Sequence, residues 1–142
     1  MSAGLQLVAH VAGRGLLFDA TRVDSVVDLP PVVPTPGASR AIRGLAALRS
    51  RVATVIDTHR VMGLTRDRSD GGGGRAVVTM IDGHLYAIAV DTLEDVAELP
   101  VAPPPAGMAL EGGWSSVCGI ADGGDETLMM LDLDQLVALA GA

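Results

Sequence analysis

The sequence contains no lysine, a single cysteine, and one residue each of phenylalanine, tyrosine and tryptophan. A lone cysteine, Cys118, excludes an internal disulfide and a zinc site built from several cysteines. With three aromatic rings and a net charge of −7, the chain also lacks the stacking residues and positive charge typical of nucleic-acid-binding proteins. We therefore expect neither a disulfide scaffold nor binding to nucleic acid.

No apolar run is long enough to cross a membrane. A spanning helix needs about 20 consecutive apolar residues, and the longest charge-free stretch, 99–110, contains four prolines. Residues 1–14 lack the basic start of a secretory signal, and His10 and Gly13 interrupt their apolar run. We expect a cytoplasmic protein that does not insert directly into the membrane.

The ten cations are all arginines, and they are confined to one part of the chain. Residues 1–75 carry ten arginines against six carboxylates, a net of +4, whereas residues 76–142 carry eleven carboxylates and no cation. Four arginines fall close together, at Arg40, Arg43, Arg49 and Arg51. Such asymmetry indicates charge-dependent association with partners and says little about fold.

The chain repeats itself. Residues 5–30 align with 75–100 at a constant offset of 70, and residues 42–64 align with 117–139 at an offset of 75. Gly13 thereby matches Gly83, and Asp57 matches Asp132. Internal similarity of this length indicates duplicated structural units. We expect a single domain over residues 1–142, with repeat halves at about 5–64 and 75–139.

Each half has the same predicted elements. Two apolar runs flank a tight hairpin turn at Ala12-Gly13 or Asp82-Gly83. Each half also has a third strand, at about 23–29 or 93–99, two strands around 49–50 or 123–125, and a short helix at about 58–64 or 133–140. The pattern predicts an all-β fold with about five strands per half. The Gly-rich segment 65–75 is expected to be a loop that joins the halves, because a strand follows it where a phosphate loop would need a helix.

The other polar residues give no catalytic or metal motif. No two of the three histidines, His10, His59 and His84, have metal-ligand spacing. Cys118 lies in an apolar strand and is expected to be a small buried side chain. The acidic run from Asp91 to Glu98 alternates with apolar residues, so we expect it on a solvated face. Asp57 and Asp132 precede the two short helices and are expected to cap them.

Three segments, 42–64, 77–100 and 118–137, resemble the CheW-like adaptors of bacterial chemotaxis. The first of these family segments has the character Gly-Val-x-Asn-Leu-Arg-Gly-x-x-x-Pro-x-x-Asp. Here Gly44, Leu48, Arg49 and Asp57 keep the pattern. The chain departs from the family's usual Asn, Gly, Pro and Glu at four positions, Ala47, Ser50, Thr54 and Ser25.

The resemblance implies two SH3-like five-stranded β-barrel subdomains with short helices, packed around a shared core. It also implies a scaffold without catalytic activity, cofactor or metal, which couples chemoreceptors to the histidine kinase CheA. Such an adaptor binds the cytoplasmic tip of the receptors and the regulatory domain of CheA. It is expected to be a monomer when free and to be recruited to membrane-associated receptor arrays.

The resemblance also suggests the binding residues. A receptor helix would lie in an apolar groove that includes Val23, Val26, Leu93 and Val96, which form two repeat-equivalent pairs. Arg43 and Arg49 match basic positions used at the kinase or receptor contacts, where the planar guanidinium can hold a carboxylate. The alternative at the residue level is that the four apolar residues belong to the core and that the two arginines are ordinary surface residues.

Two other functions stay open from the sequence. The chain could be a divergent adaptor that serves another receptor–kinase pathway, such as surface motility or development. It could also be a small enzyme that uses the acidic run of the second half. Retention of a cofactor or metal after purification would favour the enzyme.

Overall fold

The computed structural model describes residues 4–64, 74–108 and 110–141. Most of the predicted loop 65–75 thus lies outside the described residues, and its last residue, Arg75, begins a strand. The elements in chain order are β1 (Leu5–Val11), β2 (Arg14–Asp19), η1 (Ala20–Arg22), β3 (Ser25–Asp28), β4 (Ile42–Leu48), β5 (Arg51–Ile56), α1 (Thr58–Met62), β6 (Arg75–Ile81), β7 (His84–Val90), β8 (Thr92–Glu98), η2 (Gly112–Ser116), β9 (Val117–Asp122), β10 (Thr127–Leu131) and α2 (Leu133–Leu139).

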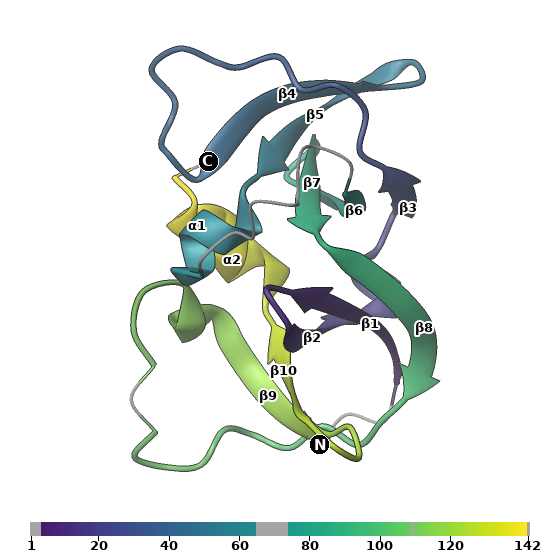
Figure 1. The fold of residues 1–142 in the computed structure, drawn as a ribbon, viewed down its shortest axis with the longest axis vertical. Coiled ribbons are helices and arrows are strands. Elements are labelled where there is room, and N and C mark those ends of the chain that lie inside the picture. The colour runs from purple at the N-terminus through teal and green to yellow at the C-terminus, as the bar shows by residue number, and fades with distance from the viewer. Residues whose placement is uncertain (1–3, 65–73, 109, 142) are drawn as a thin grey trace.

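The strands form two five-stranded sheets, which confirms the all-β class. Sheet I has the order β8-β1-β2-β10-β9, and sheet II has the order β3-β6-β7-β5-β4. Figure 1 shows sheet II above sheet I, with α1 and α2 between them on the left. Neither sheet is a closed barrel, because its two outer strands are not hydrogen-bonded to each other. These edge strands are β8 and β9 in sheet I, and β3 and β4 in sheet II.

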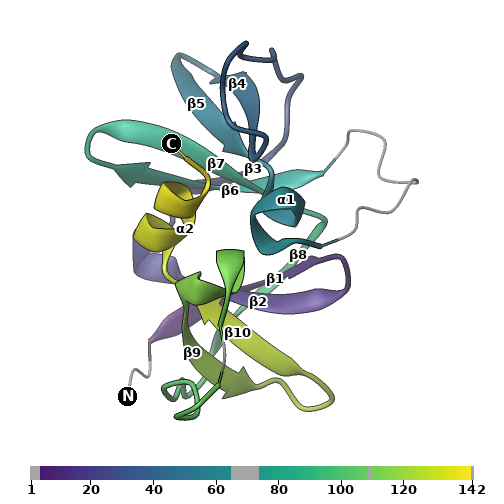
Figure 2. The ribbon, with the colours of Figure 1, turned by 90° about the vertical axis from the view of Figure 1, so that its left-hand side faces the viewer.

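The two sheets do not coincide with the two repeat halves. Each sheet takes the opening hairpin of one half and the last three strands of the other, so that β1 and β2 lie with β8, β9 and β10. Figure 2 shows β8 running from the end of β7 toward β1, which it joins as the outer strand. A half on its own would therefore hold two strands of one sheet and three strands of the other, and would complete neither.

The registers of the two sheets repeat the offsets found in the sequence. Leu7 pairs with Val96 in sheet I, and their counterparts Val77 and Val26 pair in sheet II. The parallel contacts agree as well, because Met129 pairs with Leu16 while the counterparts of these two residues, Thr54 and Tyr86, also pair. The duplication thus extends from the sequence to individual strand pairs.

The predicted hairpin turns are present in both halves. Ala12 and Asp82 have φ of 51°, and each is followed by a glycine, Gly13 or Gly83, with φ of 78° or 81°. Two consecutive residues with positive φ give the type of two-residue turn that matches strand twist. Ala12-Gly13 and Asp82-Gly83, which align in the sequence, therefore form two turns of the same type.

Apolar side chains form three clusters, as the alternation along the strands requires. In β1, for example, Leu7 and Ala9 face a core shared by both sheets and both helices, while Val8 faces a smaller cluster within sheet I. Sheet II has its own cluster, which includes Val55 and Leu85. The shared core is largest and holds the two sheets together.

The sheet edges β4 and β9 are each covered by a proline-rich connection. Val33 and Leu45 exchange two backbone hydrogen bonds of 2.8 and 2.9 Å, and Ala102 and Ile120 do the same at 2.9 and 2.8 Å. The prolines beside these bridges cannot donate to a ladder, so the connections cover the edges without extending the sheets.

Candidate partner-binding surfaces

The four apolar residues predicted to bind a receptor helix lie on or beside the edge strands β3 and β8. Val23 directly follows η1, Val26 lies on β3, and Leu93 and Val96 lie on β8. Val23, Val26 and Leu93 are half-buried and pack against the shared core. Val96 is 47% exposed. The edge strands thus present a partly exposed apolar surface, with Val96 as its most accessible member.

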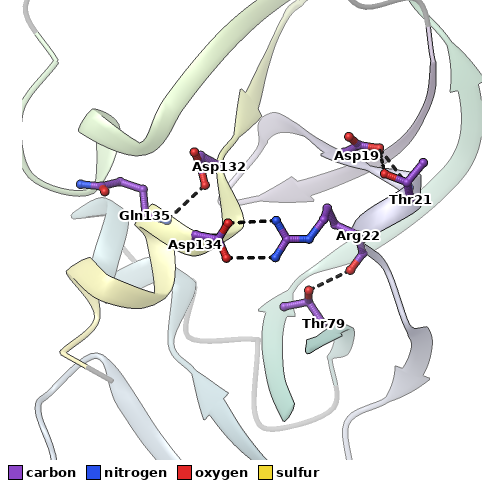
Figure 3. A network of polar contacts seen from close by, with 7 residues as sticks. All are labelled: Asp19, Thr21, Arg22, Thr79, Asp132, Asp134 and Gln135. Carbon is purple, nitrogen blue, oxygen red and sulfur yellow. Dashed lines mark hydrogen bonds and ion pairs between the residues drawn. The ribbon is translucent and has the colours of Figure 1, made fainter. Parts of the chain in front are cut away.

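A charged contact fixes the segment that leads into β3. The guanidinium of Arg22 donates two hydrogen bonds of 3.0 Å to the two carboxylate oxygens of Asp134 on α2 (Figure 3). The hydroxyl of the buried Thr79 donates to the carbonyl oxygen of Arg22 at 2.8 Å. The hydrogen bonds from Arg22 lower the pKa of Asp134, and those to Asp134 raise the pKa of Arg22. Val23 follows directly and is held in place by this contact.

The other edge strand is fixed by an equivalent contact with different chemistry. His59 on α1 is the repeat counterpart of Asp134, and its Nε2 lies 3.2 Å from Oδ2 of Asp91, just before β8. The same Asp91 oxygen accepts a 2.7 Å hydrogen bond from the backbone N–H of Ala12. The helices α1 and α2, which each end one repeat half, therefore each contact the segment just before an edge strand. Related contacts thus position β8 and β3.

The arginines that are close in sequence separate into two groups in the structure. Arg43 is near the start of β4 and Arg49 directly follows its end, so six residue steps along an extended chain, roughly 20 Å, separate them. The side chain of Arg43 is 23% exposed and Arg49 is an exposed residue. The two predicted cationic residues therefore belong to two different surfaces.

The first group surrounds the buried carboxylate of Asp57. Arg40, Arg43 and Arg60 line an open depression together with Asp57, and the Nε atoms of Arg43 and Arg60 each lie 3.6 Å from Asp57 Oδ2. Asp57 also accepts a 3.3 Å hydrogen bond from the backbone N–H of Arg60, which confirms it as the cap of α1. Part of this positive charge therefore serves the fold by neutralising a buried acid.

The second group is at the turn between β4 and β5. Arg51 donates a 2.9 Å hydrogen bond to Asp24, which lowers the pKa of that carboxyl group. Arg49 has φ of 58°, a conformation that non-glycine residues seldom adopt, and makes no ion pair with the described residues. Arg49 is thus the more accessible of the two predicted cations.

Several residues of these surfaces could not be recognised from the sequence patterns. Arg60 completes the Asp57 depression, Arg22 anchors β3, and Leu45, Val52 and Met80 are exposed apolar residues of sheet II. A comparison of the repeats could have pointed to Arg60, because its counterpart Gln135 is uncharged beside the equally placed Asp132.

Two expectations about polar residues change. Cys118 is exposed and not buried, because Val117 and Gly119 take the inward-facing positions of β9. Although the residue is exposed, its neighbours partly desolvate the thiol; this desolvation, and next the charge of Asp132, raise the pKa of Cys118, which disfavours a thiolate nucleophile. Within the acidic run, Asp95 and Glu98 are exposed as expected, but Glu94 lies 3.3 Å from Nδ1 of His10 and Asp91 contacts His59.

Within the part of the chain that the structure describes, no three histidine, cysteine or carboxylate side chains are placed to hold a metal ion. The helices of that part are also too short to span a bilayer. The described residues thus present separate apolar and cationic surfaces on a two-sheet β fold.

Comparison with known proteins identifies the family. The model of the CheW-like domain matches residues 6–140, nearly the whole chain, and the protein therefore belongs to this family. The chain thus has the fold of a chemotaxis-type adaptor, and the scaffold proteins of this family are not enzymes. A search of the curated proteins finds no match.

A solved structure supports the fold assignment. The crystal structure of the scaffolding protein TtCheW from Thermoanaerobacter tengcongensis superimposes with a TM-score of 0.80 at 23% identity. The alignment covers 94% of this chain and 86% of that one. The likeness therefore includes both sheets and is not limited to one of them.

Proposed function

We propose that the protein is a non-catalytic cytoplasmic adaptor that couples chemoreceptors to the histidine kinase CheA. Membership of the CheW-like family over residues 6–140 is the observation that carries this proposal. In this function the protein binds the cytoplasmic tip of a receptor and the regulatory domain of CheA, and is recruited with them to membrane-associated arrays.

The receptor helix is proposed to bind the apolar edge strands. Val23, Val26 and Leu93 are packed against the shared core on one side, so their remaining surface is firmly supported, and Val96 offers an exposed side chain. An amphipathic helix buries such a surface through apolar residues spaced one turn apart. The carboxylates of β8, including Glu94 and Asp95, would then contact polar residues beside the apolar face of that helix.

Arg43 and Arg49 are proposed to have different shares in binding. Arg49 is exposed and projects from a turn, so it is available to a carboxylate of a partner. Arg43 is more enclosed beside Asp57 and contributes chiefly through the cationic depression that it forms with Arg40 and Arg60.

A divergent adaptor for another receptor–kinase pathway is the second candidate. The four departures from the family pattern favour it, and two of them, Ala47 and Ser50, are exposed on the β4–β5 hairpin beside Arg49. Under this alternative the same surfaces bind a different receptor and kinase.

The test is a binding measurement with purified partners. Wild-type protein is expected to bind a CheA regulatory domain and a receptor tip at tens of micromolar or below, and Val96→Asp is expected to lose the receptor tip only. Met108→Asp, at a residue 40% exposed in the connection between β8 and η2, is the control and should bind both partners. Failure of the wild type to bind partners from any receptor–kinase pathway of its own cell would contradict the proposal.

A further inference from the structure

Three arginines from different parts of the chain meet around one carboxylate at the start of α1. Arg40 precedes β4, Arg43 lies on β4 and Arg60 lies on α1, and together with Asp57 they line one open depression. Three positive charges against one negative charge give a net of +2, in a chain whose net charge is −7. The Arg40–Arg43–Arg60 depression therefore concentrates positive charge on an acidic protein.

Asp57 does not exhaust the hydrogen-bond donors of these arginines. Its Oδ2 lies 3.6 Å from Nε of Arg43 and from Nε of Arg60. A guanidinium carries further N–H groups on its Nη atoms, and the side chain of Arg60 is 57% exposed. Arg40 is exposed as well, and it makes no ion pair with the residues that the structure describes. Arg40 and Arg60 thus keep donors for a ligand.

The repeat shows that capping the helix does not require this charge. Asp132 caps α2 as Asp57 caps α1, and the counterpart of Arg60 is the uncharged Gln135. Asp57 is only 4% exposed, and one cation is enough to balance a buried carboxylate. The remaining positive charges repel one another unless an anion lies between them. The excess of arginine therefore points to an anionic ligand.

We propose that the Arg40–Arg43–Arg60 depression binds a phosphate group, either the free ion or part of a small phosphorylated molecule. A phosphoryl group carries about −1.5 to −2 charges at pH 7, which balances the net charge of the lining, whereas a single carboxylate balances only half of it. Arginine pairs with phosphate oxygens through two parallel hydrogen bonds. A tetrahedral group also offers oxygens in several directions, as donors from a loop, a strand and a helix require.

The ligand is recognised by its phosphate group alone. The described residues that line the depression include no apolar or aromatic side chain on which a base or another ring could pack. Inorganic phosphate, pyrophosphate and adenosine diphosphate are therefore suitable probes, because only the last carries a nucleoside. We expect pyrophosphate and adenosine diphosphate to bind within about threefold of each other, since the nucleoside finds no contact in the lining.

This site goes beyond the proposed adaptor function and does not depend on it, because phosphate binding needs only the protein itself. An acidic side chain of a partner in the same depression would use the same guanidinium groups. Bound phosphate should therefore compete with that contact, and the depression would be open to a partner only when the phosphate has left.

The experiment titrates residues 1–142 with inorganic phosphate and follows the Nε–H resonances of the arginines by NMR, with sodium chloride at equal ionic strength as the reference. Phosphate, and not chloride, should shift the resonances of Arg43 and Arg60 to saturation. Arg40→Gln and Arg60→Gln should each weaken phosphate binding at least about fivefold. Arg51→Gln is the matched control, because it removes the same charge six residue steps along β5, roughly 20 Å, from Asp57. It should bind phosphate within about twofold of wild type.

Melting temperatures of the variants separate binding from folding. Arg60→Gln installs the residue that stands beside the other helix cap, so it is expected to fold. If it does not, Arg40→Gln decides, because Arg40 makes no contact with Asp57 that folding would need.

The remaining outcomes overturn the inference. Shifts that do not saturate, or that chloride reproduces, would show screening of charge only. Saturable binding that both Arg40→Gln and Arg60→Gln retain would place the phosphate elsewhere. Adenosine diphosphate that binds more than about tenfold tighter than pyrophosphate would show that the nucleoside is recognised. A protein that binds phosphate but neither receptor nor kinase would leave this site standing and contradict the adaptor function.

Discussion

Arg49 occupies in one repeat the backbone conformation that Gly124 occupies in the other. The two positions are related by the offset of 75, and their φ angles are 58° and 96°. For a residue with a Cβ, this left-handed region costs roughly 1–2 kcal/mol. The fold thus has a glycine at this turn in sheet I and a strained arginine in sheet II, and the proposed binding role of Arg49 would account for that strain.

Replacing Arg49 by glycine should therefore separate folding from binding. We expect Arg49→Gly to leave the free energy of unfolding unchanged or to raise it by up to about 1 kcal/mol, because relief of the strain is partly offset by the flexibility of glycine. Binding of the partner that contacts the turn should weaken, and Arg49→Glu should weaken it further. Denaturant titration together with binding isotherms tests both points. A clear loss of stability in Arg49→Gly would instead give the arginine a structural role.

Asp57 should matter more to folding than its repeat counterpart. Both aspartates cap a helix, with hydrogen bonds of 3.3 Å from Arg60 N and 3.2 Å from Gln135 N, but only Asp57 is buried among arginines. We expect Asp132→Ala to cost about 1 kcal/mol, the usual value of a cap. Asp57→Ala should cost about 3 kcal/mol, because it also leaves enclosed positive charge without its acid. Equal losses in denaturant titrations would show that the arginine contacts add nothing.

The positions of the strands and helices could be predicted from the sequence because their signals are local. Turns at Ala12-Gly13 and Asp82-Gly83, caps at Asp57 and Asp132, and the apolar runs between them all follow from short patterns. The exchange of strands between the halves could not be predicted. β3 has the same alternation whichever hairpin it joins, and because the hairpins are related by duplication, either offers it a suitable edge.

The candidate site was predictable only in part for a related reason. Arg43 and Arg49 are neighbours in sequence, but an extended strand carries them apart, whereas Arg60 comes back to Arg43 through the helix that follows β5. Burial also depends on which face of a strand meets the core, so Cys118 was assigned to the wrong face of β9. The separation of the arginines and the facing of Cys118 are both set by contacts between distant parts of the chain, which a local pattern does not contain.

The ion pair between Arg22 and Asp134 should add a small amount to the free energy of unfolding, and this contribution should disappear in acid. Arg22 lowers the pKa of Asp134 in the folded state, so this contribution is complete above the ordinary carboxyl pKa of about 4 and is lost as the pH falls through the lowered value. Because both side chains are partly exposed, we expect Asp134→Asn to cost about 0.2–1 kcal/mol at neutral pH and nothing in strong acid.

Urea titrations from neutral pH down to the acid limit would measure this difference. Arg22→Gln should remove the same pH-dependent share, and the double variant should show no further loss, as expected for two residues that act on each other. A difference between wild type and Asp134→Asn that stays constant with pH would show that the ionised pair is not its source.

Gly44 should be intolerant of any side chain. A Cβ placed there would overlap the carbonyl oxygen of Val33, the residue whose hydrogen bonds with Leu45 cover the edge of sheet II. Since the obstacle is backbone, it cannot rotate away, so Gly44→Ala must displace the proline-rich connection or distort β4. We expect a loss of at least about 3 kcal/mol in the free energy of unfolding, together with faster hydrogen exchange at the amide of Leu45.

Gly37→Ala is the matched control, because Gly37 also has positive φ but no atom lies within 4 Å of its added Cβ. That variant should lose only about 1 kcal/mol, the cost of the backbone conformation alone. If the two alanine variants unfold at the same denaturant concentration, the close approach of the connection to β4 does not hold in solution.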